Sequence, residues 1–397
     1  MKNYEKRYEL LKESLGERGI SIDEVKEKLK SLRIETPSWG YGDSGTRFYV
    51  FKQKGAARDV WEKIQDAAQV HKLTGVCPTV ALHIPWDYTE NWEELLEYTK
   101  SLGVKPGAIN PNLFQDDDYK LGSLCNPDKR IREKAIAHIL ECIDIASKLG
   151  SRDISLWISD GTNHPGQDDI KERKHRLEES LMEVYKNLGN NMRLLIEYKF
   201  FEPAFYLTDV GDWGMAYLLS TKLGPKAMVL VDLGHHPLGT NIEQIVAYLI
   251  DEKRLGGFHF NNKKYADDDL TVGSINPYEL FLIYNELVAA EYDGIKLDVA
   301  YMIDQSHNIK QKIEEMLQSV ENIQKAYAKA LIVDRKFLKK YQLEGDIVSA
   351  EKILTDAFET DVMPIIYKAR EELGVPLDPI SSLRDSGYLE KIRKERV

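Results

Sequence analysis

Cysteine is scarce in this chain of 397 residues, which contains only Cys77, Cys125 and Cys142. The three are far apart, odd in number and never arranged as Cys-x-x-Cys, so the sequence indicates neither a disulfide framework nor a thiolate zinc site. We expect three reduced and mostly buried thiols.

Excess positive charge and long apolar runs are also missing. Lys and Arg total 54 against 65 Asp and Glu, a net charge of −11, and no segment gathers basic residues, so nucleic acid is not an expected partner. No stretch is long and apolar enough to span a bilayer. The charged first residues do not resemble a secretion signal, and we predict a cytoplasmic protein without membrane contact.

Short β-branched apolar runs alternate with longer stretches of helical periodicity between Thr36 and Asp304. This alternation is typical of βα units around a parallel sheet. Eight such strands close a barrel, so the predicted fold class is α/β, a (β/α)8 TIM barrel. The predicted strands are Leu32–Trp39, Val76–His83, Val104–Asn110, Asp153–Ile158, Arg193–Lys199, Ala227–Asp232, Gly257–Asn261 and Ile295–Met302.

Helical patterns also flank the predicted barrel at both ends. We predict an N-terminal helical segment over residues 1–31, the catalytic barrel over 32–332 and a C-terminal helical extension over 333–397. Pro364, Pro376 and Pro379 interrupt the helical pattern of that extension. Such additions usually pack on the outside of a barrel or on another subunit, and we expect the extension to make subunit contacts in a homo-oligomer.

Ionisable side chains follow the predicted strands, at the end of a barrel where loops hold the chemistry. Glu197 and Lys199 are two residues apart on one strand and therefore point to the same side. One interpretation is a buried ion pair that fills the barrel, although such pairs stabilise weakly. The other makes Glu197 a metal ligand and Lys199 a donor to a substrate oxygen.

The next two strands each supply a histidine. Asp232 and His235 end one strand three residues apart, with His236 as the competing choice, and His235 is preferred because the next helix is expected near Asn241. His259 stands between Phe258 and Phe260 and points opposite to both, toward the barrel interior if the rings pack outward. Taken alone, it is equally consistent with a hydrogen-bonded core histidine.

Three further acids complete the predicted cluster. Asp267 and Asp269 can face the same way from the loop after His259, although a solvated acidic turn is the alternative, and Asp304 ends the last strand behind apolar residues. Carboxylates this close would raise one another's pKa values unless a cation lies among them. Oxygen and imidazole ligands without thiolate favour Mn²⁺, Co²⁺ or Mg²⁺, and the number of ligands predicts two ions.

Six stretches, in order along the chain, resemble the bacterial L-rhamnose isomerases of the xylose isomerase-like barrels, and the likeness extends from Val25 to Glu390. At Asn262-Lys263 the chain departs from that pattern, in which an acid followed by a small polar residue is commoner. The six stretches are Pro37–Gly40, Leu82–Asp87, Glu202–Tyr206, Val231–His236, Gly256–Asn261 and Met302–Asn308.

The resemblance implies two Mn²⁺-like ions. It assigns the first to Glu197, Asp232, His259 and Asp304, and the second to His235, Asp267 and Asp269 with Asp232 as the bridge. It also implies that Lys199 binds a substrate oxygen near C1 and His83 the oxygen that closes the sugar ring. Trp157 and Phe114 would form an apolar wall, completed by Trp39 and Phe51 from loops, Phe51 in its own or a neighbouring subunit of a homotetramer.

The predicted activity is therefore a metal-dependent aldose–ketose isomerase, with L-rhamnose and L-rhamnulose as the first pair and Lys199, His83 and Asp304 as catalytic residues. A hydride shift and a cis-enediol route both fit this arrangement. The alternatives are a related barrel epimerase, a metal-dependent phosphodiesterase, which should show a basic surface, and a non-catalytic sugar-binding protein.

Overall fold

The computed structural model describes residues 3–45, 49–158, 164–202, 208–306 and 309–396. Parts of two stretches used for the family resemblance, residues 203–206 and 307–308, lie outside these ranges. No helix in the described ranges is long and apolar enough to cross a membrane.

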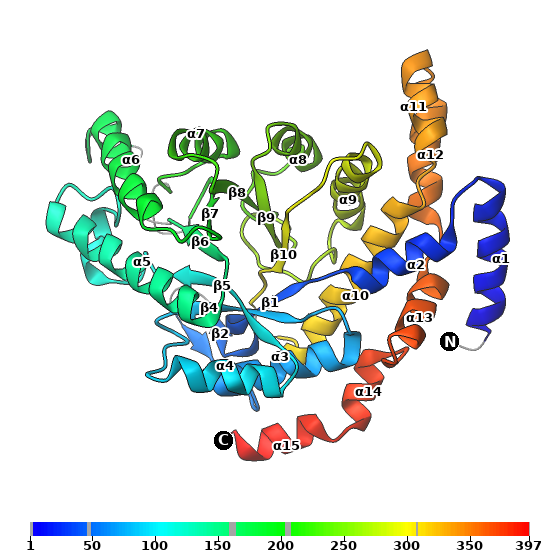
Figure 1. Ribbon diagram of the computed structural model, residues 1–397, viewed down its shortest axis with the longest axis horizontal. Helices are drawn as coiled ribbons and strands as arrows, with labels where there is room; N and C mark the ends of the chain where they lie inside the picture. Colours follow the sequence, from blue (N-terminus) through cyan, green and yellow to red (C-terminus); the bar gives the residue numbers. More distant parts are fainter. Residues whose placement is uncertain (1–2, 46–48, 159–163, 203–207, 307–308, 397) are drawn as a thin grey trace.

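Eight parallel strands close into a barrel in the order β1-β10-β9-β8-β7-β6-β5-β4, which confirms the predicted fold class (Figure 1). Neighbouring strands follow one another along the chain, as successive βα units require. The strands are β1 (Glu35–Pro37), β4 (Thr79–Ile84), β5 (Lys105–Pro111), β6 (Asp153–Trp157), β7 (Arg193–Glu197), β8 (Ala227–Asp232), β9 (Leu255–Phe260) and β10 (Ala300–Ile303).

Helices cover the outside of the barrel, and most begin at an Asp or Asn whose side chain accepts a hydrogen bond from the first turn. These caps satisfy backbone donors that would otherwise lack partners, and they account for where the helices start. The helices are α3 (Val60–Thr74), α4 (Trp92–Ser101), α5 (Lys129–Leu149), α6 (Ile170–Lys186), α7 (Trp213–Leu223), α8 (Ile242–Asp251), α9 (Pro277–Tyr292) and α10 (Lys312–Leu331).

Small and medium apolar side chains fill the barrel interior. Ala81, Ala108, Leu195, Leu230 and Met302 form a separate inner cluster, whereas the much larger apolar core lies between strands and helices. The interior is therefore packed rather than open, and polar chemistry is confined to the two ends.

The amino-terminal end of the barrel is closed by charged groups. Arg193 pairs with Asp153, with 2.7 Å between Nε and Oδ1, and donates to the Asp298 carbonyl. Glu35 accepts from the Ala108 amide, and a side chain at Gly107 would overlap its carboxylate. Because the chain around Asp298 is held in this way, the last strand begins at Ala300 rather than at Ile295 as predicted.

A short excursion leads from β1 to α3. The chain turns in a 3-10 helix, η1 (Ser38–Tyr41), where we predicted strand to Trp39, and then forms a two-stranded sheet of β2 (Ser44–Gly45) and β3 (Val50–Phe51). A second 3-10 helix, η2 (Asp117–Leu121), follows β5. The β2–β3 sheet was not anticipated from the sequence.

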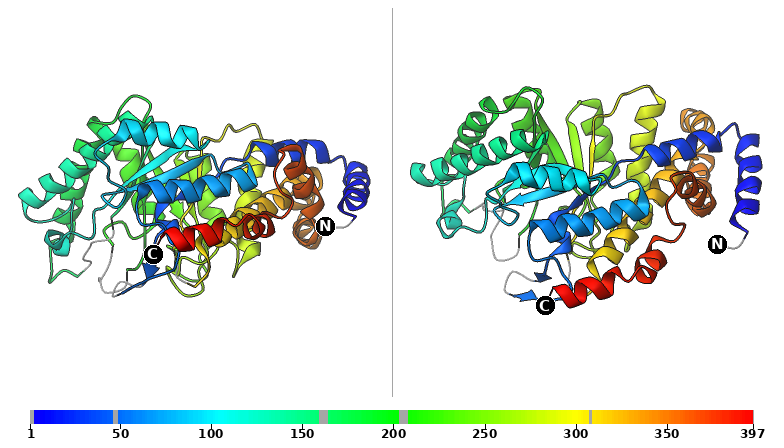
Figure 2. Two further views of the ribbon diagram at one scale, coloured as in Figure 1. Left: turned by 90° about the horizontal axis from the view of Figure 1, so that it is seen from below. Right: turned by 60° about the horizontal axis from the view of Figure 1, so that its bottom comes forward.

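The remaining helices begin on one side of the barrel, where α1 and α2 pack against α13, and the last two then run beneath α3 (Figure 1 and Figure 2). They are α1 (Tyr4–Glu17), α2 (Ile22–Ser31), α11 (Arg335–Glu344), α12 (Ile347–Glu359), α13 (Met363–Glu372), α14 (Pro379–Asp385) and α15 (Tyr388–Glu395). The boundaries 1–31, 32–332 and 333–397, and the subunit contacts, stay predictions.

The C-terminal residues of the chain pack back against the barrel. Arg396 is buried and pairs with Asp66 of α3, with 2.6 Å between Nη1 and Oδ2. The same guanidinium donates to the Gly55 carbonyl, in the segment that joins β3 to α3. The C-terminal residues thus brace α3 and the segment that precedes it.

Candidate metal centre

Consecutive strands β7, β8, β9 and β10 each carry an ionisable side chain at or next to their carboxyl end, at the same end of the barrel. Glu197, Asp232, His259 and Asp304 each offer one ligand atom, and these atoms all lie within 4.8 Å of one another. The register explains the grouping, because Asp232 pairs with His259 across the β8–β9 ladder and parallel strands bring their carboxyl ends to one rim.

A second group shares one of these residues. Asp232, His235 and Asp267 also place one ligand atom each within 4.8 Å of one another. The side chain of His235 contacts both groups, with 3.1 Å from Nδ1 to Glu197 Oε1 and 3.3 Å from Nε2 to Asp267 Oδ1. Asp232 therefore lies where the resemblance places a bridging ligand.

Gly234 leaves space between the carboxylates of the second group. A Cβ at this position would stand 3.2 Å from Asp232 Oδ1 and 3.2 Å from Asp267 Oδ1. Its amide donates to Asp232 Oδ1 at 2.7 Å, and Asn261 donates to both oxygens of the same carboxylate. These hydrogen bonds hold the Asp232 carboxylate in place, and the missing side chain of Gly234 leaves room for a cation beside it.

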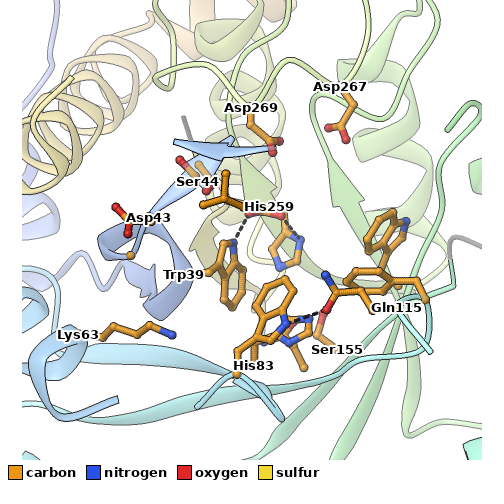
Figure 3. Close-up of a pocket in the computed structure, with 18 of the residues that line it drawn as sticks. Trp39, Asp43, Ser44, Lys63, His83, Gln115, Ser155, His259, Asp267 and Asp269 are labelled. Carbon is orange, nitrogen blue, oxygen red and sulfur yellow. Dashed lines mark hydrogen bonds and ion pairs between the residues drawn. The ribbon is translucent and has the colours of Figure 1, made fainter. Parts of the chain in front are cut away.

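Asp269 faces the same cavity but falls outside both groups (Figure 3). Burial raises its pKa well above the usual range, and the carboxylates of Asp267, Asp304 and Asp232 raise it further. Asp268, between the two, accepts from the Tyr265 amide at 2.8 Å and does not join the cluster. The role of Asp269 as a ligand stays a prediction.

The competing histidine has a different partner. His236 is buried, and its Nε2 lies 2.7 Å from the Tyr198 hydroxyl. Burial, followed by the nearby Lys263 ammonium, lowers the pKa of His236 to about 3. Within the described residues His236 belongs to neither group, and Asn241 caps α8 as expected.

The pKa values of the ligand candidates show how strongly the charged groups of the cluster affect one another. Burial and the carboxylates of Glu197, Asp304 and Asp267 raise the pKa of Asp232 to about 7, against the opposing effect of His235. Burial opposes ionisation of Glu197 as well, but the two imidazoles outweigh it and lower the Glu197 pKa to about 2. Divalent ions would take over the charge compensation that protons supply here.

Lys199 lies directly beside the second group. Its ammonium forms ion pairs with Glu202 and Asp267 and stands 4.9 Å from the centre of the Trp157 ring. Both Lys199 and Glu202 are buried. A single buried ion pair in the barrel does not account for this arrangement, because Lys199 also contacts a residue of the second group.

Aromatic rings form a wall of the cavity beside the ligand groups (Figure 3). Phe114 and Trp157 lie 4.5 Å apart between ring centres, and His83 stacks on Trp86 at 3.7 Å. Trp39, on η1 rather than in a loop, donates from Nε1 to Asp304 Oδ1 at 2.8 Å. Four of the five residues predicted to bind the sugar by their rings therefore line one cavity of about 650 Å³: His83, Trp157, Phe114 and Trp39.

Phe51 is the exception. It lies in strand β3 rather than in a loop, its side chain is 48% exposed, and among the described residues it is Val50 and Lys52, not Phe51, that line the cavity. Alternation along a strand explains this, because Phe51 points to the opposite side from its two neighbours. A contribution of Phe51 to a neighbouring subunit stays a prediction.

Several buried polar atoms of the cavity lack a hydrogen-bond partner in the described part of the chain: His83 Nδ1, Ser155 Oγ and Trp157 Nε1. Buried polar groups are normally paired, so a hydroxyl-rich ligand would supply what is missing. Burial, with smaller contributions from Lys63 and His138, lowers the pKa of His83 to about 3, so its imidazole is neutral and one ring nitrogen can accept a hydrogen bond from a sugar hydroxyl.

A network that the sequence did not reveal supports His83. Asp87 is fully buried and accepts from the His83 amide at 2.8 Å, from Lys63 of α3 at 2.6 Å and from the Ser38 hydroxyl of η1. It ties three elements together below the aromatic wall. Only its place in the stretch Leu82–Asp87 pointed to it.

Replacing Trp39 by phenylalanine tests the hydrogen bond to Asp304. The ring is kept but the 2.8 Å donor is lost, and such supporting contacts are typically worth about 10-fold to 100-fold in metal affinity or activity. We expect a fall in affinity for the first ion, measured by titrating the metal-free protein with Mn²⁺. An unchanged affinity would show that Trp39 only lines the cavity and does not support the first ion.

A closed parallel barrel with acids and imidazoles gathered at its strand ends defines a (β/α)8 protein with a candidate metal centre. Residues 64–324 match the xylose isomerase-like TIM barrel family, and the chain belongs to this family.

Relatives of known name cover nearly the whole chain. A probable sugar isomerase of Rhizobium meliloti (strain 1021) is 47% identical over 395 residues, which are 98% of this chain and 92% of the relative. The L-rhamnose isomerase of Bacteroides thetaiotaomicron is 22% identical over 86% of each chain. A solved L-ribulose 3-epimerase has a TM-score of 0.56 at 14% identity, covering 80% of this chain and 98% of its own, and shows likeness of fold alone.

Proposed function

We propose that the protein is a metal-dependent aldose–ketose isomerase that interconverts L-rhamnose and L-rhamnulose, with activity on other aldoses as well. The observation that carries this proposal is the pair of ligand groups sharing Asp232, with Lys199 and an aromatic wall beside them. The 47% identity to a probable sugar isomerase supports the same reaction class.

The donors present suit the proposed ions. Each group combines carboxylate oxygens with an imidazole and contains no thiolate, a set that favours Mn²⁺, Co²⁺ or Mg²⁺, and we propose Mn²⁺. Glu197, Asp232, His259 and Asp304 would hold the first ion, and Asp232, His235, Asp267 and Asp269 the second. When bound, the two ions polarise neighbouring sugar oxygens and stabilise negative charge that develops on them.

The protein's own residues position the sugar. Lys199 would donate a hydrogen bond to the oxygen on C1, and the neutral His83 would bind the oxygen that closes the ring. Phe114, Trp157 and Trp39 exclude water from one face of the sugar, which strengthens every polar contact on the other face.

The wall of the cavity favours an uncharged sugar over a sugar phosphate. Among the described residues that line the cavity, the three lysine and arginine side chains each have a carboxylate partner, so none of these three is left to neutralise a phosphate dianion. The pairs are Lys52 with Asp43 at 3.1 Å, Arg58 with Glu62 at 2.6 Å and Lys63 with Asp87 at 2.6 Å.

Metal removal and sugar choice can be tested together. After treatment with a chelator we expect no ketose from any aldose, and added Mn²⁺ should restore turnover with L-rhamnose ahead of the other aldoses in a panel. Conversion of ketose to an epimeric ketose, without aldose, would instead identify an epimerase. Solvent deuterium in the product at C1 or C2 would exclude a pure hydride shift.

A further inference from the structure

Lys263, just after β9, is a buried lysine that the proposed reaction does not use. It is 9% exposed, and its ammonium donates to the Leu233 carbonyl at 2.7 Å. Within the described ranges no carboxylate lies within 4.0 Å of it. Removing an ammonium from water is costly, and one carbonyl does not compensate for that cost, so the charge must be balanced from further away.

Half of the carboxylates that supply this balance belong to the candidate metal centre. Burial lowers the pKa of the Lys263 ammonium, and Glu279, Asp232, Asp267 and Asp268 oppose this effect. Two of these four, Asp232 and Asp267, belong to the second ligand group. The lysine therefore stands where its charge acts on that group.

Lys263 also holds the backbone on which the second group is built. Leu233 lies between Asp232 and His235, its carbonyl accepts from Lys263 and its amide donates to the His259 carbonyl at 3.1 Å. Asn261, two residues before Lys263, binds the Asp232 carboxylate. One short segment after β9 thus supports both the carboxylate and the turn that follows it.

The charges of the loaded centre can be compared with those of its own carboxylates, leaving aside Glu279 and Asp268, which act on Lys263 from outside the centre. Two divalent ions together with the ammonium groups of Lys199 and Lys263 carry as much positive charge as the carboxylates in or touching the centre carry negative. Those carboxylates are Glu197, Glu202, Asp232, Asp267, Asp269 and Asp304.

We propose that Lys263 is a positioning residue that sets the affinity of the second metal ion: it fixes the turn between Asp232 and His235, and its charge weakens the hold of Asp232, His235 and Asp267 on a divalent cation. This inference rests on the proposed function. Lys199 pairs with Asp267, and Lys263 binds the Leu233 carbonyl between Asp232 and His235, whereas in the described structure neither contacts a residue that belongs to the first group alone. The two ions are therefore expected to bind with different affinities, the second more weakly.

The test is a titration of the full-length, metal-free protein with Mn²⁺, following free Mn²⁺ by electron paramagnetic resonance. Wild type should show one tight and one weaker ion. Lys263→Gln keeps a donor but removes the charge, and we expect the weaker ion to bind about tenfold more tightly while the tight ion changes little. Lys263→Arg, which keeps the charge, should match wild type.

Lys264→Gln is the matched control, because it makes the same chemical change at the neighbouring exposed position and should leave both affinities unchanged. Unaltered or weaker binding of the second ion to Lys263→Gln would overturn the inference. Should this variant not fold, as judged by circular dichroism, Lys263→Met removes the charge and the donor together, and the weaker ion is again expected to bind more tightly. Failure of wild type to bind Mn²⁺ would contradict the proposed function itself.

Discussion

Replacing Lys199 by methionine is expected to lower kcat by about 10²-fold to 10³-fold while both metal ions remain bound. The ammonium is the donor nearest to the second group, and no other cation contacts Asp267 in the described structure except the imidazole of His235. Methionine keeps the length of the side chain and its packing under Trp157 but cannot donate a hydrogen bond.

The measurement is the rate of ketose formation at saturating aldose, together with the metal content of the purified variant. Loss of the ammonium leaves the buried Glu202 carboxylate without this partner, so the melting temperature must be recorded to show that the variant is folded. A folded variant with two ions and wild-type kcat would argue for a sugar-binding or structural role for Lys199.

Replacing Asp232 by asparagine is expected to remove both metal ions and to lower turnover by more than about 10³-fold, because among the described residues it alone is common to the two groups. Asp304 belongs to the first group alone, so Asp304→Asn should lose the first ion and keep the second. Metal analysis after gel filtration distinguishes the two variants directly.

Asp269→Asn serves as the informative comparison. If Asp269 is a ligand, this variant loses affinity for the second ion; if its carboxylate only faces the cavity, affinity is unchanged. Equal metal content in Asp232→Asn and wild type would contradict the shared-ligand arrangement altogether.

Much of the fold could be predicted because it depends on a repeated local pattern. Strand β8 was predicted to the residue, and β6 and β7 differ from their predictions only at the carboxyl end. The predicted strand Ile295–Met302 began too early, because Arg152 and Arg193 hold Asp298 at the end of the barrel, a contact that periodicity cannot reveal. The β2–β3 sheet escaped notice because each of its strands has two residues.

The clustering of the candidate ligands could be predicted because parallel strands bring consecutive carboxyl ends together. The choice of His235 over His236 followed from where α8 begins. The supporting residues could not be predicted in the same way: Asp87 acts on a backbone amide, and Ser155 matters only because its hydroxyl has no partner within the described chain. Nothing in the sequence shows whether a polar side chain is paired.

The brace formed by Arg396 has a consequence for the order of folding. This arginine supports Gly55 and α3, the side of the cavity that carries Lys63, yet it is synthesised after every strand of the barrel. A nascent chain can therefore close its barrel on the ribosome while this side of the cavity still lacks its final support. The contacts of Arg396 with Gly55 and Asp66 can form only after all of these strands have been made.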